Sequence, residues 1–213
     1  MRRARSIIVV AALIATTAAA RADEDEMSVE AHVIAGAARV GEEGTHQVAS
    51  VPVAGVTGEL NYGIRDWLAL GGELAYAQTG AAHFDMVPVV LRGVPEPAAG
   101  LDRSARLARA IVGGTLRLGV RVVPTIFVGA GAALRMRPGA TYTPTGDVPD
   151  DHAASTTIDL VIASRVGLDY RINRRWLVGL WAGAIAAVPF GAPSFQSAEG
   201  GLRVEYAWYP MIF

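Results

Sequence analysis

Residues 51–79 alternate with period two on both sides of a short polar turn, Ile64-Arg65-Asp66, and this pattern constrains the fold more than any other in the chain. Apolar side chains occupy alternate positions, and small or polar side chains occupy the positions between them. Successive strand residues point to opposite faces of a sheet, so the segment is predicted to form a β-hairpin. Its apolar face comprises Ala54, Val56, Leu60, Tyr62 and Ile64 in the first strand and Leu68, Leu70, Leu74 and Tyr76 in the second.

The opposite face of this hairpin carries a carboxylate in the middle of each strand, Glu59 and Glu73. A packed apolar core does not accept such charges unless they are paired. A transmembrane β-barrel reverses the usual order, because its apolar side chains face lipid and its polar side chains face the lumen. We therefore expect Leu68, Leu70 and Leu74 to face lipid and the two glutamates to face a lumen.

The first 22 residues have the three parts of a secretory signal peptide. Three arginines precede an uncharged apolar run at residues 7–17, and Ala20-Arg21-Ala22 supplies an A-x-A cleavage motif. The apolar run is too short to span a bilayer comfortably, which argues against an uncleaved anchor. We expect cleavage to leave residues 23–213 as a single barrel domain. Cleavage removes four arginines and no acidic residue, so the formal net charge changes from −1 to −5, which disfavours nucleic-acid binding.

Further segments with strand texture bring the predicted number of strands to eight, and long and short connections alternate strictly. The additional strands are predicted at 27–37, 106–120, 125–136, 157–170, from 176 onward and from 198 to the end. The long connections are 38–50, 79–105, 137–156 and 189–197, and the short ones are 64–66, 121–124 and 171–175. Outer-membrane barrels have short periplasmic turns and longer external loops. We predict an all-β fold, an eight-stranded antiparallel up-and-down transmembrane β-barrel, with residues 79–105 forming a loop that holds at most a short strand.

The uncharged segment at residues 176–196 is also a candidate transmembrane helix. Pro189 and Pro193 interrupt it and leave 13 residues from Trp176 to Val188. As a helix, those residues would cover roughly 20 Å, less than the ~30 Å hydrocarbon layer. We therefore expect a strand from Trp176, although its continuous apolar residues leave its inward face unassigned.

With this topology the chain resembles the small eight-stranded outer-membrane barrels of the OmpA and OmpX type. The resemblance covers residues 27–213 and rests on the topology, on turns at 63–68 and 170–177 that look periplasmic, and on the terminal Phe213. In that family a terminal aromatic residue is the assembly signal that the barrel-assembly machinery recognises. The resemblance implies a monomeric, multi-pass protein in the outer membrane of a Gram-negative bacterium, in contact with outer-membrane lipid.

The predicted lumen-facing positions collect charges of both signs. An eight-stranded barrel has an interior just wide enough for side chains to fill, and pairing offsets the cost of taking charges out of water. We interpret this network as a structural plug rather than an ion path, and expect the two glutamates of the hairpin to pair with arginines such as Arg117. The network comprises Glu59, Glu73, Arg109, Arg117, Arg135, Asp159, Arg165, Arg203 and Glu205.

Candidate catalytic or metal-binding residues occur in the predicted external loops. His83 and Asp85 would need to converge with Ser50 or Ser155 to form the grouping of a rim-sited lipid-modifying enzyme. Asp150-Asp151-His152 offers ligands to a cation but lacks a recognised metal-site spacing. We predict a non-catalytic protein without cofactor or metal, with a structural or surface-recognition role through its external loops. A lipid-modifying enzyme, a narrow channel and a soluble lipocalin-like barrel are the alternatives.

Overall fold

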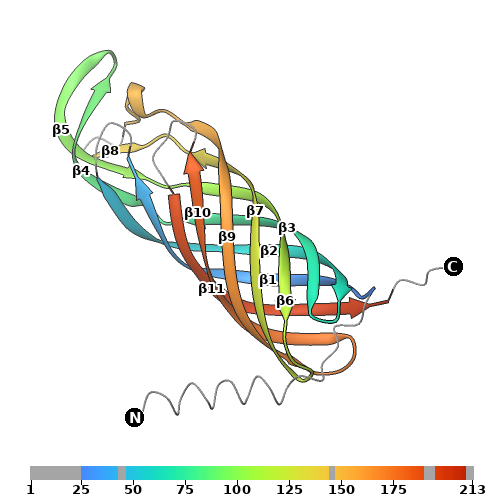
Figure 1. Cartoon of the computed structure of the whole chain (residues 1–213). Coiled ribbons are helices and arrows are strands. Elements are labelled where there is room, and N and C mark those ends of the chain that lie inside the picture. The colour runs from blue at the N-terminus through green and yellow to red at the C-terminus, as the bar shows by residue number, and fades with distance from the viewer. Residues whose placement is uncertain (1–24, 43–46, 144–146, 190–194, 210–213) are drawn as a thin grey trace, which may run out of the picture.

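The structure is a computed structural model that describes residues 25–42, 47–143, 147–189 and 195–209. Eight antiparallel strands close into a barrel in the order β1-β11-β10-β9-β7-β6-β3-β2 (Figure 1), as predicted. The predicted signal peptide and Phe213 lie outside the described residues. The barrel strands are β1 (Met27–Gly41), β2 (Val48–Arg65), β3 (Leu68–Thr79), β6 (Arg106–Arg117), β7 (Val122–Arg137), β9 (Ser155–Arg171), β10 (Trp176–Pro189) and β11 (Phe195–Trp208).

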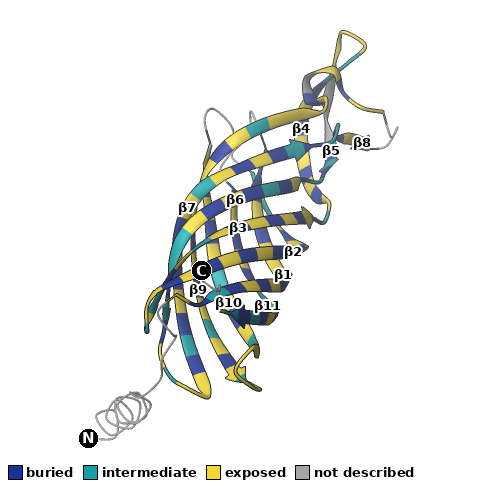
Figure 2. Ribbon diagram, turned by 90° about the vertical axis from the view of Figure 1, so that its right-hand side faces the viewer, coloured by how far each residue is buried: buried dark blue, intermediate teal, exposed yellow. Residues whose placement is uncertain are grey.

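A second, three-stranded sheet projects beyond one end of the barrel (Figures 1 and 2). It has the order β4-β5-β8 and comprises β4 (Ala82–Leu91), β5 (Val94–Arg103) and β8 (Thr141–Thr143), with the short 3-10 helix η1 (Asp150–His152) nearby. We call this end the long-loop end. The opposite, short-turn end carries the start of β1 and the end of β11, where Met27 pairs with Trp208.

The β4–β5 hairpin corrects the prediction of a loop with at most a short strand at residues 79–105. Leu91 pairs with Val94, so Arg92-Gly93 is a two-residue turn. Both turn residues have positive φ, 52° and 78°, which matches a type I′ turn, the geometry whose twist suits a hairpin. The prolines of this segment suggested a loop, but the structure accommodates them in strands.

Side chains alternate along the barrel strands as predicted, with buried and exposed residues in turn (Figure 2). Leu74 is 70% exposed on the outer wall, whereas Glu59 is 4% exposed inside the barrel. Leu70 is also exposed on the outer wall, and Leu68, at the start of β3, is only partly so. The barrel therefore presents its apolar side chains outward and its charges inward.

The turn between β6 and β7 differs from the prediction, which placed it at 121–124. β6 ends at Arg117 and β7 begins at Val122. Gly119 adopts a φ of 116°, which residues other than glycine rarely adopt. The Leu118 amide donates to the Pro124 carbonyl at 2.9 Å. Gly119 therefore sets the position of the turn, which lies a few residues before the predicted Arg121–Pro124 segment.

The uncharged segment from Trp176 forms strand β10, as expected. Within the described part of the chain, no helix has the length and apolar character needed to cross a membrane. The structure also assigns the inward face that the sequence left open. Trp181 and Ile185 are buried inside the barrel, and Leu180 and Val188 are exposed on its outer wall.

The strands are staggered around the barrel, and the stagger fixes their tilt. A row of paired residues that starts at Leu70 on β3 returns to Gly80, one residue beyond the end of that strand, so the stagger is ten residues. Eight strands with this stagger tilt by about 40° from the barrel axis. The row runs through Gly114, Val128, Ser164, Ala184, Ala198, Ala37 and Pro52.

Candidate functional site in the lumen and at the long-loop end

Arg117, the last residue of β6, centres a cluster of ion pairs at the short-turn end of the lumen. Its guanidinium lies 2.7 Å from Glu205, 3.1 Å from Glu30 and 3.5 Å from Glu26. Arg203 forms an ion pair with Asp169 and lies 3.7 Å from Glu30. Arg117 therefore forms ion pairs with three carboxylates, which come from β11, from β1 and from the residue before β1.

Arg165 on β9 occupies the middle of the lumen. Its Nη2 donates to Glu59 Oε2 at 2.6 Å, and its Nη1 lies 3.1 Å from Glu73. The guanidinium carbon also stands 4.0 Å from the centroid of the Phe127 ring and 5.9 Å from that of Trp181. Ion pairs and aromatic rings thus meet around one side chain across the barrel.

Arg109 on β6 links opposite sides of the barrel. Its Nε donates to Glu73 at 2.9 Å, and its two Nη atoms donate to the two oxygens of Glu199 at 3.0 and 2.9 Å. The Ser197 hydroxyl donates to the same Glu199 carboxylate at 2.7 Å. This bidentate geometry is the strongest common form of an arginine–carboxylate pair.

Two further clusters lie toward the long-loop end. Arg135 on β7 is 2.9 Å from Asp159 on β9. Beyond it, Arg103 donates to Glu42 Oε1 at 2.9 Å and to the His152 carbonyl at 3.0 Å, and His152 Nδ1 lies 3.1 Å from the same Glu42 oxygen. The second cluster connects the end of β5, at the base of the projecting sheet, to the rim of the barrel.

The structure places all nine predicted network residues inside the barrel, each with an oppositely charged partner. Both hairpin glutamates pair with lumenal arginines, as expected, but the example of Arg117 is wrong: Glu59 pairs with Arg165, and Glu73 pairs with Arg109 and Arg165. Glu73 lies opposite Ile111 on β6, six residues from Arg117 along that strand. The distance along the strand separates these side chains even though they share the lumen face.

Sequence reasoning missed Glu199, which is as deeply buried as its partners. The signal was present, because Ser197, Glu199, Arg203 and Glu205 all occupy alternate positions of β11. The cluster of Glu42, Arg103 and His152 had no comparable signal. Its members lie at strand ends and in η1, where no periodic pattern extends.

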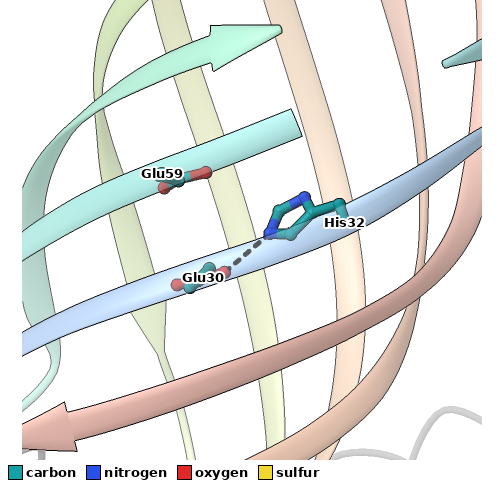
Figure 3. Close-up of side chains that lie close together, drawn as sticks. All are labelled: Glu30, His32 and Glu59. Atoms are coloured by element: carbon teal, nitrogen blue, oxygen red, sulfur yellow. Dashed lines mark hydrogen bonds and ion pairs between the residues drawn. The ribbon is translucent and has the colours of Figure 1, made fainter. Parts of the chain in front are cut away.

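Glu30, His32 and Glu59 are the described residues that could hold a metal ion, with ligand atoms within 4.8 Å of one another (Figure 3). His32 Nε2 lies 2.9 Å from Glu30 Oε2, and Arg165 Nη1 lies 3.2 Å from His32 Nδ1. A guanidinium only donates, so Nδ1 accepts and Nε2 carries the proton shared with Glu30. A cation at Nε2 would have to replace this proton and lie beside the Arg165 guanidinium, which also binds Glu59, so the triad fits a hydrogen-bonded network better than a metal site.

The predicted catalytic candidates at the long-loop end are engaged with one another. His83 Nδ1 lies 2.6 Å from Asp102, and His83 Nε2 lies 3.1 Å from Asp85. A histidine acting as a base for a serine needs a nitrogen free to face the hydroxyl, and carboxylates occupy both nitrogens. Ser50 is exposed on the outer face of β2. The grouping of an enzyme is therefore not assembled around His83.

The Asp150-Asp151-His152 motif is divided by the fold. The Asp150 carboxylate accepts a hydrogen bond at 2.9 Å from the Gly93 amide in the β4–β5 turn. His152 instead faces the buried Glu42. These two side chains serve different contacts and do not form a shared cation site.

Comparison with known proteins places this barrel in a family. The family model described as "Outer membrane protein beta-barrel domain" matches residues 8–204. The chain belongs to this family. It is a multi-pass protein of the Gram-negative outer membrane, and its resemblance to small eight-stranded outer-membrane barrels is confirmed. The short-turn end is therefore periplasmic, and the long-loop end is external.

Solved structures share the barrel fold at low sequence identity. Ail, the attachment invasion locus protein of Yersinia pestis, is 14% identical over 87% of this chain and 100% of that chain, with a TM-score of 0.50. The N-terminal beta-barrel domain of Pseudomonas aeruginosa OprF is 15% identical over 87% and 98%, with a TM-score of 0.42. No curated protein sequence matches the chain significantly. At this identity the likeness concerns the fold alone.

We expect the external sheet to loosen as pH rises through the pKa of His83. The hydrogen bond to Asp102, together with the charges of Asp102 and Asp85, raises the pKa of His83 above its usual value of 6.5. Because the pKa of His83 is higher in the folded protein than in the unfolded chain, protonation of its imidazole stabilises the fold. This stabilisation is complete below about pH 6.5 and is lost as pH rises through the pKa of folded His83. The protection factors of the β4–β5 amides, which correct for the faster intrinsic exchange at higher pH, should fall across that range. H83Q should remove this fall in protection, and identical protection factors for the two proteins at every pH would contradict the assignment.

Proposed function

We propose that the chain is a non-catalytic surface-recognition protein whose contact surface is the external β4-β5-β8 sheet. The observation that carries this proposal is the exposure of two apolar side chains outside the barrel, one on each strand of the β4–β5 hairpin. Met86 is 72% exposed and Val94 is 56% exposed, although neither lies on the lipid-facing wall. Outside the bilayer, these side chains are open to contact with another molecule.

The strand order of the sheet supports the same function. β4 stands at an edge of the β4-β5-β8 sheet, and an edge strand presents backbone groups that pair with an added strand. Gln47 donates to the Asp85 carbonyl at 2.5 Å, which engages one acceptor near the base of β4. The positive φ of Met86, 55°, turns its side chain away from regular strand geometry. The partner would be an extended protein segment with apolar side chains.

The engagement of His83 by two carboxylates supports a role in recognition over lipid modification. A rim-sited enzyme would need a histidine nitrogen directed at a serine hydroxyl or a water molecule. The acidic groups around His83 instead tie β4 to β5, because His83 and Asp102 are directly paired across the two strands. In this proposal the cluster stiffens the contact surface.

The experiment that tests this function shortens the hairpin without touching the barrel. Phe84 and Leu101 are paired and buried, so joining them through Asn-Gly removes residues 85–100 and leaves a two-residue turn. Cells that display either protein would be applied to immobilised synthetic peptides that alternate apolar and polar residues, the pattern of an extended strand. We expect the full chain to bind these peptides and the shortened chain to lose that binding while keeping its heat-modifiable gel mobility. Equal binding by both proteins, or binding by neither, would reject the proposal.

We further propose that the lumenal ion pairs form a plug rather than a path for ions. The purified protein should give no steady conductance in a planar lipid bilayer, because Arg165, Phe127 and Trp181 meet across the middle of the lumen. Replacing both Arg165 and Trp181 by alanine should produce channel openings. Steady conductance by the unaltered protein would favour the narrow-channel alternative.

We retain the proposals that residues 1–22 are a cleaved signal peptide, that Phe213 guides the barrel-assembly machinery, and that the barrel is a monomer. The intact mass of protein extracted from outer membranes should correspond to a chain that begins at Asp23. Leucine at both Ala20 and Ala22 should block cleavage, since the protease requires small residues there. Leucine at Ala19 is the matched control and should leave processing unchanged. A mature protein that retains residue 1 would contradict the cleavage.

A further inference from the structure

A shallow groove crosses the lipid-facing wall of the barrel over β1, β11, β10 and β9. It has a volume of about 440 Å³. Arg39 lies in one row with its two paired neighbours, Ser50 on β2 and Gln196 on β11, and these three polar residues line the groove at one end. Below them the lining consists largely of small side chains, including Ala37, Ala184, Ala186 and Ala198.

The depth of Arg39 places it at the outer edge of the apolar band. Arg39 lies twelve residues beyond Met27 along β1, which at ~3.3 Å per residue and a tilt of about 40° gives a height of about 30 Å. Met27 marks the periplasmic boundary, because it pairs with Trp208, and exposed Trp176 meets Tyr206 in a tilted arrangement nearby with ring centroids 4.9 Å apart. The apolar band of an outer-membrane barrel is ~25 Å tall, so Arg39 stands where the outer-leaflet headgroups begin.

The charge of Arg39 lacks a counterpart within the described part of the chain. The residue is exposed on the outward face, and no ion pair or hydrogen bond joins its side chain to another described residue. An exposed arginine at a membrane boundary costs little, and its charge is attracted to anionic lipid headgroups. Ser50 and Gln196 add a hydroxyl and an amide donor on either side. Such a set of donors matches a phosphate group, which has several strong acceptor oxygens.

We propose that this groove binds a phosphorylated glycolipid of the outer leaflet. Its phosphate contacts Arg39, with Ser50 and Gln196 beside it, and an acyl chain lies along the small residues below. Small side chains leave space that a hydrocarbon chain fills with favourable contacts. The occupant is a glycolipid rather than a phospholipid, because the site lies in the leaflet that faces outward in a Gram-negative envelope and its neutral polar groups suit sugar hydroxyls. This site is separate from the external sheet and from its recognition function.

Native mass spectrometry of the detergent-purified full chain with bisphosphorylated lipid A tests the proposal. The unaltered protein should retain one tightly bound lipid. R39Q should weaken binding about tenfold or more, as expected for the loss of a charge-assisted contact. A184L, which fills the groove with no change of charge, should also weaken it. Removing the phosphates from the lipid should weaken binding to the unaltered protein at least as much as R39Q weakens binding of intact lipid A.

Matched controls separate this site from other sources of binding. R92Q removes an exposed arginine at the tip of the β4–β5 hairpin, and A110L enlarges an outward alanine on β6; both should bind as the unaltered protein does. Unchanged binding by R39Q would overturn the proposal, as would equal affinity for phosphatidylglycerol. Glu43 is close to Arg39 in sequence but lies outside the described residues. If E43Q binds lipid A tenfold more tightly than the unaltered protein, Glu43 pairs with Arg39 in the free protein, and the proposal is overturned.

Discussion

Replacing Arg109 by methionine is expected to destabilise the folded barrel by about 3–5 kcal/mol. Its guanidinium is buried and is shared between Glu73 and both oxygens of Glu199. Glu73 keeps a second partner in Arg165, whereas Glu199 keeps only the hydroxyl of Ser197 among the contacts described above. The variant therefore leaves a buried carboxylate without a cation, which is the costly way to break an ion pair. Urea unfolding in phospholipid vesicles, followed by gel mobility, measures the change in the free energy of unfolding.

Two further variants distinguish a lost ion pair from a general effect of losing an arginine. R92M removes an exposed arginine at the hairpin tip and should change the free energy of unfolding by no more than about 0.5 kcal/mol. Adding Glu199→Leu to the Arg109 variant should recover part of the loss, because it removes the stranded carboxylate. If the single Arg109 variant unfolds at the urea concentration of the unaltered protein, the lumenal network does not hold the barrel together.

On the strands that alternate clearly, the sequence was sufficient to predict which face is lumenal, but not which lumenal residues pair. Period-two alternation assigns Glu73 and Leu74 to opposite faces, because a strand side chain has only two directions. Pairing depends in addition on height, which follows from the stagger of ten residues around the closed barrel. Arg109 and Glu199 are 90 residues apart in sequence and meet only because the barrel closes. No local pattern carries that information.

The external sheet was missed for a different physical reason. Prolines disfavour central strands, since they donate no ladder hydrogen bond, and the segment at 79–105 contains several. They are tolerated here because Pro88 lies on the edge strand β4, and because the described part of β8 pairs only with Gly100–Asp102 of β5, which leaves Pro95 and Pro97 beyond that ladder. Once the Arg92-Gly93 turn is recognised, the register sets His83 opposite Asp102. The contact that defines this cluster was therefore predictable from the hairpin, but not from the spacing of histidine and aspartate alone.

Introducing arginine at Leu74 should destabilise the barrel by about 2–4 kcal/mol in a bilayer, the cost of a cation on the lipid face near the midplane. Leu74 is 70% exposed near the middle of β3, between Gly58 and Ala110 on the neighbouring strands. Q78R, on the same face and strand but four residues nearer the external rim, is the matched control and should cost about 1 kcal/mol or less. Unfolding in phospholipid vesicles compares the two. In a soluble lipocalin-like barrel the apolar face would turn inward, so recovery of folded L74R protein from the aqueous fraction without detergent would contradict a lipid-facing β3.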